Sequence, residues 1–229
     1  MVAGGVMTTR VRLPAPAYTP GSAAHAHAAG AARIGPNVVI QTYHALVARG
    51  DLELAEGVLL DATGRTPATL PEAMVEEREA VAIVHRVRQV LDEDAAAAVL
   101  ADAGERTARY LLANRIPRLA QLVMQGAPAG LAFRFLANAM ARHAWTFAGS
   151  GRFEWATEPR TLLRIHACPM CRDVRASRPF CGYYAATFDT LVRTLVSRRL
   201  GVREVRCRAL GDACCEFAVA PVEGDVTTA

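Results

Sequence analysis

Residues 204–217, EVRCRALGDACCEF, indicate a β-hairpin that carries cysteines on both of its strands. Gly211 and the aspartate after it favour a turn, because glycine and aspartate tolerate the backbone conformations that tight turns require. Successive side chains of a strand point to opposite faces, so we expect Val205 and Cys207 to share one face. The turn then brings Cys207 opposite Cys215 of the second strand.

All six cysteines of the chain lie in its last quarter. They are Cys168, Cys171, Cys181, Cys207, Cys214 and Cys215. Cys214 points to the other face of its strand from Cys215, which leaves five thiols that can meet. Zinc takes four ligands in a tetrahedron, and a C-x-x-C segment provides two of them. The pattern favours a structural zinc site and leaves open buried free thiols, an iron–sulfur cluster or a redox pair.

Upstream of the hairpin, the sequence predicts two strands at residues 152–156 and 161–167, a cysteine-bearing loop and a helix over about residues 183–200. The helix carries apolar residues at helical spacing. Residues 151–220 are therefore expected to form a C-terminal unit for zinc and ligand binding, built from a small antiparallel β-sheet with a packed helix.

Residues 33–150 are predicted to be helical. Pro117 and Pro128 mark helix starts, because proline fits the first turn of a helix. Residues 93–113 are rich in alanine and are expected to be helical with a break at Gly104, since glycine weakens a helix interior. The fold class is thus α+β, with a helical N-terminal portion followed by the small antiparallel β-sheet.

The two ends of the chain are expected to lie outside this fold, as a disordered leader at residues 1–32 and a tail at residues 221–229. The leader has no apolar run typical of a signal peptide, and no stretch elsewhere has the roughly 18 apolar residues of a membrane-spanning helix. We therefore expect a cytoplasmic protein that does not span a membrane.

The charged residues exclude several kinds of chemistry. The chain has 26 basic residues, all arginine, against 22 acidic ones, which gives a formal net charge of +4. The absence of lysine excludes a Schiff-base lysine, a P-loop lysine and a lysine general base. No large block of the chain is basic enough to suggest nucleic-acid binding.

Several motifs together resemble a known family. CGYY at residues 181–184, VREVRCRALGD at residues 202–212 and CEF at residues 215–217 are similar to the 4-vinyl-reductase domain. Further segments narrow the resemblance to the BchJ family of bacteriochlorophyll-biosynthesis proteins, which bears the name divinyl chlorophyllide 8-vinyl reductase. These segments are RIGPN at 33–37, TARYLL at 107–112, RIP at 115–117 and HAWTFAGSG at 143–151.

The resemblance also implies a ligand set for the metal and an assembly state. Related domains hold a structural zinc through three cysteines and a glutamate, and the matching cysteines here are Cys181, Cys207 and Cys215. The glutamate does not transfer by motif, since Glu154 and Glu158 both lie near the place. The fourth ligand is expected to be Cys168, Cys171 or Glu158. Relatives that dimerise around an acyl chain imply a homodimer with an apolar cavity.

Two functions are consistent with this pattern. Reduction of a vinyl group needs a hydride donor, and the sequence has no G-x-G-x-x-G motif that follows a strand and opens a helix. We therefore expect a carrier or accessory factor that binds a divinyl (proto)chlorophyllide-type tetrapyrrole and works beside other bacteriochlorophyll-synthesis enzymes. The alternative is a catalytic 8-vinyl reductase with an external electron donor. A ligand sensor would need an output domain.

A planar tetrapyrrole needs an apolar pocket, a cation for its carboxylate and an axial ligand for its magnesium. The residues predicted for this site are Tyr43, Arg115, Phe135, His143, Trp145, Phe147 and Tyr184. Phe133 is a further candidate for the lining, His44, His85 and His166 for the axial ligand, and Arg142 for the carboxylate.

Overall fold

The computed structural model describes residues 32–222, and the predicted leader and most of the predicted tail lie outside them. The helical part contains α1 (Asn37–Val47), α2 (Leu52–Thr63), α3 (Glu77–Val90), α4 (Glu93–Asn114), α5 (Arg118–Gly126), α6 (Ala129–Arg142) and α7 (Trp145–Ala148). Two short strands, β1 (Arg33–Ile34) and β2 (Val75–Glu76), pair antiparallel within this part, and the 3-10 turn η1 (Pro67–Thr69) precedes β2.

A four-stranded antiparallel sheet follows the helices, in the order β3-β4-β6-β5. Its strands are β3 (Arg152–Ala156), β4 (Leu162–His166), β5 (Leu200–Arg206) and β6 (Cys214–Pro221). The helix α8 (Gly182–Leu195) and the 3-10 turns η2 (Pro169–Cys171) and η3 (Arg208–Leu210) lie between these strands in the chain. The predicted α+β class is therefore confirmed.

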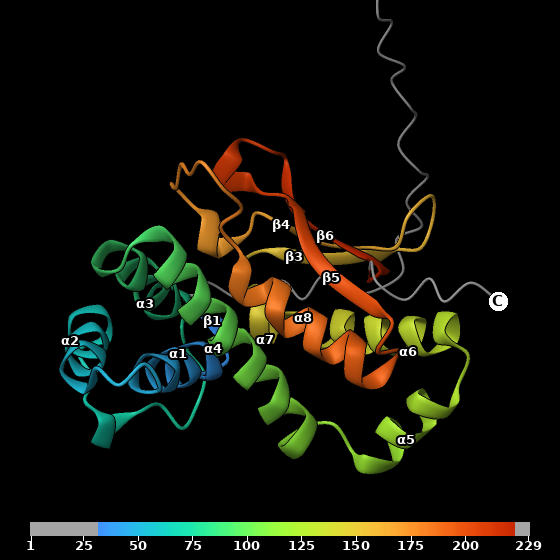
Figure 1. Ribbon diagram of the computed structural model, residues 1–229, viewed down its shortest axis with the longest axis horizontal. Coiled ribbons are helices and arrows are strands. Elements are labelled where there is room, and N and C mark those ends of the chain that lie inside the picture. Colours follow the sequence, from blue (N-terminus) through green and yellow to red (C-terminus); the bar gives the residue numbers. More distant parts are fainter. Residues whose placement is uncertain (1–31, 223–229) are drawn as a thin grey trace, which may run out of the picture. The chain divides into compact units, whose positions relative to one another are not determined.

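Helix α8 joins the two parts, because it packs against β5 and also against α4 (Figure 1). Tyr184 and Phe188 of α8 meet Phe217 of β6 with ring centroids 6.4 and 5.2 Å apart. Burial of such aromatic side chains is the main favourable term in folding a core of this kind. The sheet and the helical part thus share one hydrophobic core.

Gly104 does not break α4, contrary to the prediction. A Cβ atom at this position would lie 2.2 Å from the backbone oxygen of Tyr183. The absence of a side chain therefore allows α4 and α8 to approach closely. The prediction was wrong because the cost of glycine in a helix is small beside the packing that the close approach allows.

The predicted helix at 183–200 ends earlier than expected. Helix α8 stops at Leu195, and Leu200 already pairs with Pro221 in the sheet. The Asp189 carboxylate accepts a hydrogen bond of 2.7 Å from the backbone N–H of Val202, which ties the start of β5 to α8. Strand pairing therefore determines the structure of residues that local pattern assigned to the helix.

A buried carboxylate connects the start of α3 to the segment before β3. Glu77 accepts hydrogen bonds from the backbone N–H and the hydroxyl of Ser150, at 2.6 and 2.9 Å, and forms an ion pair of 2.9 Å with Arg172. Gly149 has a φ of 55°, and a Cβ there would lie 2.2 Å from the Glu77 carboxylate. This explains the glycines at 149–151 as parts of a turn.

No helix within residues 32–222 is long and apolar enough to cross a membrane.

We predict that Gly104→Ala lowers the free energy of unfolding by about 1–3 kcal/mol, because a methyl group would force α4 and α8 apart. Gly57→Ala is the matched control. Gly57 lies inside α2 with no neighbour near its Cβ position, so the same change should stabilise the protein by about 0.5–1 kcal/mol. Urea unfolding measures both, and a neutral or stabilising Gly104→Ala would contradict the close packing.

Candidate metal centre

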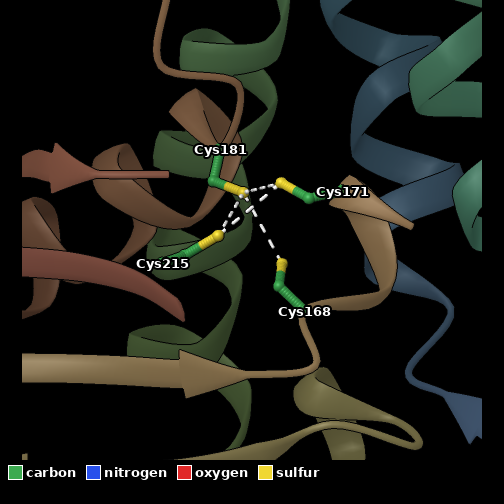
Figure 2. Close-up of side chains that lie close together, drawn as sticks. All are labelled: Cys168, Cys171, Cys181 and Cys215. Carbon is green, nitrogen blue, oxygen red and sulfur yellow. Dashed lines mark hydrogen bonds between the residues drawn. The ribbon is translucent and has the colours of Figure 1, made fainter. Parts of the chain in front are cut away.

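Five of the six cysteines converge in the core where the ends of β4 and β6, the start of α8 and the η2 and η3 turns meet (Figure 2). Cys168 and Cys171 flank η2, Cys181 precedes α8, Cys207 follows β5, and Cys215 lies on β6. All five are buried.

The sulfur atoms are as close together as the ligands of one metal ion. Cys171 Sγ lies 3.2 Å from Cys181 Sγ and 3.6 Å from the sulfurs of Cys207 and Cys215. Cys181 Sγ lies 3.6 Å from those of Cys168 and Cys215. Four sulfurs around zinc at about 2.3 Å would be separated by roughly 3.8 Å. These thiols can therefore hold a metal ion.

A carboxylate that the sequence reasoning missed completes a second ligand set. Glu204 of β5 joins Cys181, Cys207 and Cys215, with all four ligand atoms within 4.8 Å of one another. Glu204 Oε2 accepts a hydrogen bond of 2.8 Å from the Cys181 backbone N–H, whereas Oε1 is buried without a hydrogen-bond partner in the described part of the chain. An unpartnered buried carboxylate oxygen is costly, and a metal ion would remove that cost.

A β-bulge brings Glu204 and Cys207 to the same face. Residues three apart on a regular strand point to opposite faces. Here Glu204 pairs with Phe217 but Arg206 pairs with Glu216, so the register shifts by one residue between them. The bulge leaves Val205 42% exposed while Cys207 is fully buried. The prediction that Val205 and Cys207 share a face was therefore wrong.

The crowding of thiols shifts their acidity. Hydrogen bonds from the Cys171 and Cys181 thiols lower the pKa of Cys207 to about 6, and those from Cys168 and its neighbours lower the pKa of Cys215 to about 5. Burial raises the pKa of Glu204 to about 9, with the charge of Cys207 adding to the effect. Two thiols are thus ready to bind a cation as thiolates near neutral pH.

Helix α3 supports this cluster through two side chains. Arg88 donates a hydrogen bond of 2.8 Å to the backbone oxygen of Phe180, and its guanidinium lies 4.1 Å from the Phe180 ring centroid. The guanidinium is attracted to the charges of Cys181 and Glu204. His85 Nε2 lies 2.9 Å from the backbone oxygen of Met170, which fixes η2 beside the cluster.

The two glutamates considered from the sequence lie elsewhere. Glu158 is exposed in the turn between β3 and β4, at the opposite end of β4 from Cys168, so it is not part of the cluster. Glu154 lies on the polar face of the sheet, where His166 Nε2 is 2.7 Å from its carboxylate. Cys214 lies on that face too, 3.9 Å from Glu216, as the alternation along β6 predicts.

The residues predicted for the tetrapyrrole do not form one site. Phe147 and Tyr184 meet in the core, where the Tyr184 hydroxyl donates to the Phe147 backbone oxygen at 2.7 Å. Tyr43 is buried in α1, and Phe133 packs at 6.1 Å from Trp155. The other predicted residues are exposed: His44, Arg115, Phe135, Arg142, His143 and Trp145.

An open cavity of about 790 Å³ lies between α3 and η2. Val81, Ala82, Pro169 and Val174 supply its apolar lining, and His85 also faces it. Its polar lining contains Arg78 and Arg172 together with Glu76, Glu77 and Asp173. None of the seven residues predicted for the tetrapyrrole lines this cavity.

Comparison with known proteins identifies the family. Residues 161–221 match the model of the vinyl-4-reductase domain. Over 189 residues the chain is 36% identical to the bacteriochlorophyll synthase 23 kDa chain of Cereibacter sphaeroides, a match that covers 82% of this chain and 91% of that protein. The chain belongs to this family. The resemblance to the BchJ family that the motifs indicated is confirmed.

Two further similarities accompany this match. The BchJ-family protein of Rhodobacter capsulatus, also named bacteriochlorophyll synthase 23 kDa chain, is 35% identical over 82% of this chain and 87% of its own length. Among solved structures, the phenol-responsive sensory domain of the transcription activator PoxR is 13% identical, with a TM-score of 0.46. That match covers 62% of this chain and 73% of the other.

We predict that Cys215→Ser abolishes stoichiometric metal binding and lowers the free energy of unfolding by about 4 kcal/mol or more, because metal binding contributes directly to folding. Cys214→Ser is the control, since Cys214 lies on the other face of the same strand, and it should change stability by about 0.5 kcal/mol or less. Elemental analysis and thermal unfolding measure both. Equal behaviour of the two variants would contradict the metal centre.

Proposed function

We propose that this chain is an accessory protein of bacteriochlorophyll synthesis that binds a divinyl (proto)chlorophyllide-type tetrapyrrole and presents it to other enzymes of that synthesis. The observation that carries the proposal is the 36% identity to the bacteriochlorophyll synthase 23 kDa chain along 91% of that protein. The proposal includes a structural zinc in the thiol cluster and a homodimer, as the motifs imply.

For the metal, we propose Cys181, Glu204, Cys207 and Cys215 as the zinc ligands. The buried, unpartnered Glu204 Oε1 supports this choice over a site of cysteines alone. Zinc in this site would have a closed set of four protein ligands, which is typical of structural rather than catalytic sites. Cys168 and Cys171 would then surround the site, with their thiols hydrogen-bonded to the ligand sulfurs.

Two substitutions separate this ligand set from one in which Cys171 is the fourth ligand. We predict that Glu204→Gln weakens zinc binding by more than about 100-fold, beyond the 10–100-fold typical of residues that only support a ligand. Cys171→Ser should stay within that smaller range. Competition with a chromophoric chelator measures both affinities. Strong loss in Cys171→Ser and retention in Glu204→Gln would assign the fourth position to Cys171.

For the pigment, we propose the cavity between α3 and η2. Its volume falls in the range of about 300–1,000 Å³ that is common for small-molecule sites. A backbone oxygen only accepts, so His85 must donate to Met170 through Nε2, which leaves a lone pair on Nδ1. Such a nitrogen is suited to an axial position on magnesium, and Arg78 or Arg172 is suited to the pigment carboxylate.

The exposed residues predicted from the sequence form the second candidate for the pigment site, with Trp145 as its largest ring. We predict that His85→Gln weakens pigment binding at least about tenfold, because glutamine preserves the hydrogen bond to Met170 but removes the ring nitrogen. Trp145→Ala should leave binding unchanged. Titration of the Soret band measures both, with zinc content as the check on folding. The opposite pattern would move the site to the exposed residues.

Whether the protein catalyses is tested with the same pigment. Divinyl protochlorophyllide mixed with the purified protein should give a shifted Soret band without turnover. Conversion to the monovinyl product with NADPH or reduced ferredoxin would contradict the carrier function and establish the alternative, a catalytic 8-vinyl reductase. A brown protein with iron and an absorption band near about 400 nm would replace zinc by an iron–sulfur cluster.

A further inference from the structure

Helices α5 and α6 present an apolar face to solvent. They form a helical hairpin at the lower right of Figure 1, and both pack against α8. Five large apolar side chains on them are exposed, from 51% for Leu131 to 72% for Leu119. We call these residues the α5–α6 face: Leu119, Leu122, Val123, Leu131 and Phe135.

This exposure follows from helical spacing rather than from irregular structure. In α5, Gln121 and Met124 are buried, whereas the side chains at 119, 122 and 123 form a stripe on the opposite side. In α6, the buried residues include Phe133 and Leu136, and the exposed stripe contains Leu131 and Phe135. An apolar stripe on the outer side of a helix is uncommon on a soluble surface and indicates a binding partner.

The charge around this face has a single sign. Residues 106–153 contain seven arginines and no aspartate or glutamate. Arg106 and Arg109 pair with acidic side chains one turn earlier in α4. Four more arginines, all exposed, lie on or beside the α5–α6 hairpin and form no ion pair within residues 32–222: Arg115, Arg118, Arg134 and Arg142.

We propose that the α5–α6 face binds the surface of an anionic lipid membrane. Leucine, valine and phenylalanine side chains would enter the boundary between headgroups and acyl chains, while the arginines would contact lipid phosphates. The two helices would lie along the membrane without crossing it. This combination of exposed apolar side chains with arginines alone is the pattern of an interfacial amphipathic helix.

A second copy of the chain fits this face less well. A symmetric dimer would bring the same patch of both copies together, and so would place unpaired arginines against arginines. Like charges at an interface oppose association unless acidic groups intervene, and residues 106–153 supply none. The proposal does not depend on pigment or zinc binding, because none of its residues lines the cavity or belongs to the cluster.

The test is co-sedimentation of the full chain with vesicles. We expect binding to vesicles of phosphatidylcholine with one quarter phosphatidylglycerol, and little binding to phosphatidylcholine alone. Arg118→Gln and Arg134→Gln should each lower the partition coefficient about fivefold, and Leu122→Ser with Phe135→Ser at least about tenfold. Raising the salt to about 1 M should weaken binding, because charges are then screened.

Matched controls come from other exposed positions of the same types. Leu60→Ser on α2 and Arg203→Gln on β5 should leave vesicle binding unchanged. Soret titration and zinc content should stay unchanged in all variants, which separates failure of this proposal from failure of the pigment proposal. No vesicle binding, or equal loss in the controls, would overturn the proposal. So would a dimer that the face variants convert to a monomer in light scattering.

Discussion

Five thiols and a carboxylate share one buried volume, and the C-terminal half of the structure depends on how their charge is balanced. Three of the thiolates together with the carboxylate would carry four negative charges in a low-dielectric interior, which is unfavourable without a cation. A divalent metal offsets two of these charges, and the Arg88 guanidinium lies close enough to offset part of the rest. Without a cation, protons must take that place, as the raised pKa of Glu204 indicates.

The cluster connects elements that would otherwise be held mainly by packing. Its members come from the ends of β4 and β6, from the η2 turn, from the start of α8 and from both sides of the β5 bulge. The loop between Pro169 and Cys181 has little regular structure of its own, and Cys171 and Cys181 both anchor it. The same loop forms one wall of the cavity proposed for the pigment. Metal binding would therefore stabilise that wall.

The sequence was sufficient to predict elements that depend on local pattern. The strand at 152–156, the helix starts after Pro117 and Pro128, and the convergence of the five thiols all agree with the structure. It was insufficient where one residue changes the phase of a strand. Regular alternation places Glu204 opposite in face to Cys207, and only the bulge reverses this. The E-x-x-C spacing at 204–207 was the one available signal for this ligand.

The pigment residues show a second limit of sequence reasoning. Tyr43, Phe147 and Tyr184 are aromatic because the core is aromatic, and helical spacing does not distinguish a core ring from one that lines a ligand site. Phe135 was predicted to line a pocket but lies 55% exposed, because α6 buries its opposite side against α8 and β3. Gly104 shows the same dependence on tertiary contact, since its role appears only where α8 meets α4.

The central claim is that zinc is held by three of the thiols and Glu204. Zinc X-ray absorption spectroscopy of the purified protein tests it most directly, because sulfur and oxygen ligands differ in distance. The account predicts three sulfur atoms at about 2.3 Å and one oxygen at about 2.0–2.2 Å. A shell of four sulfur atoms would contradict the role of Glu204, and a stoichiometric iron content without zinc would contradict the structural zinc site itself.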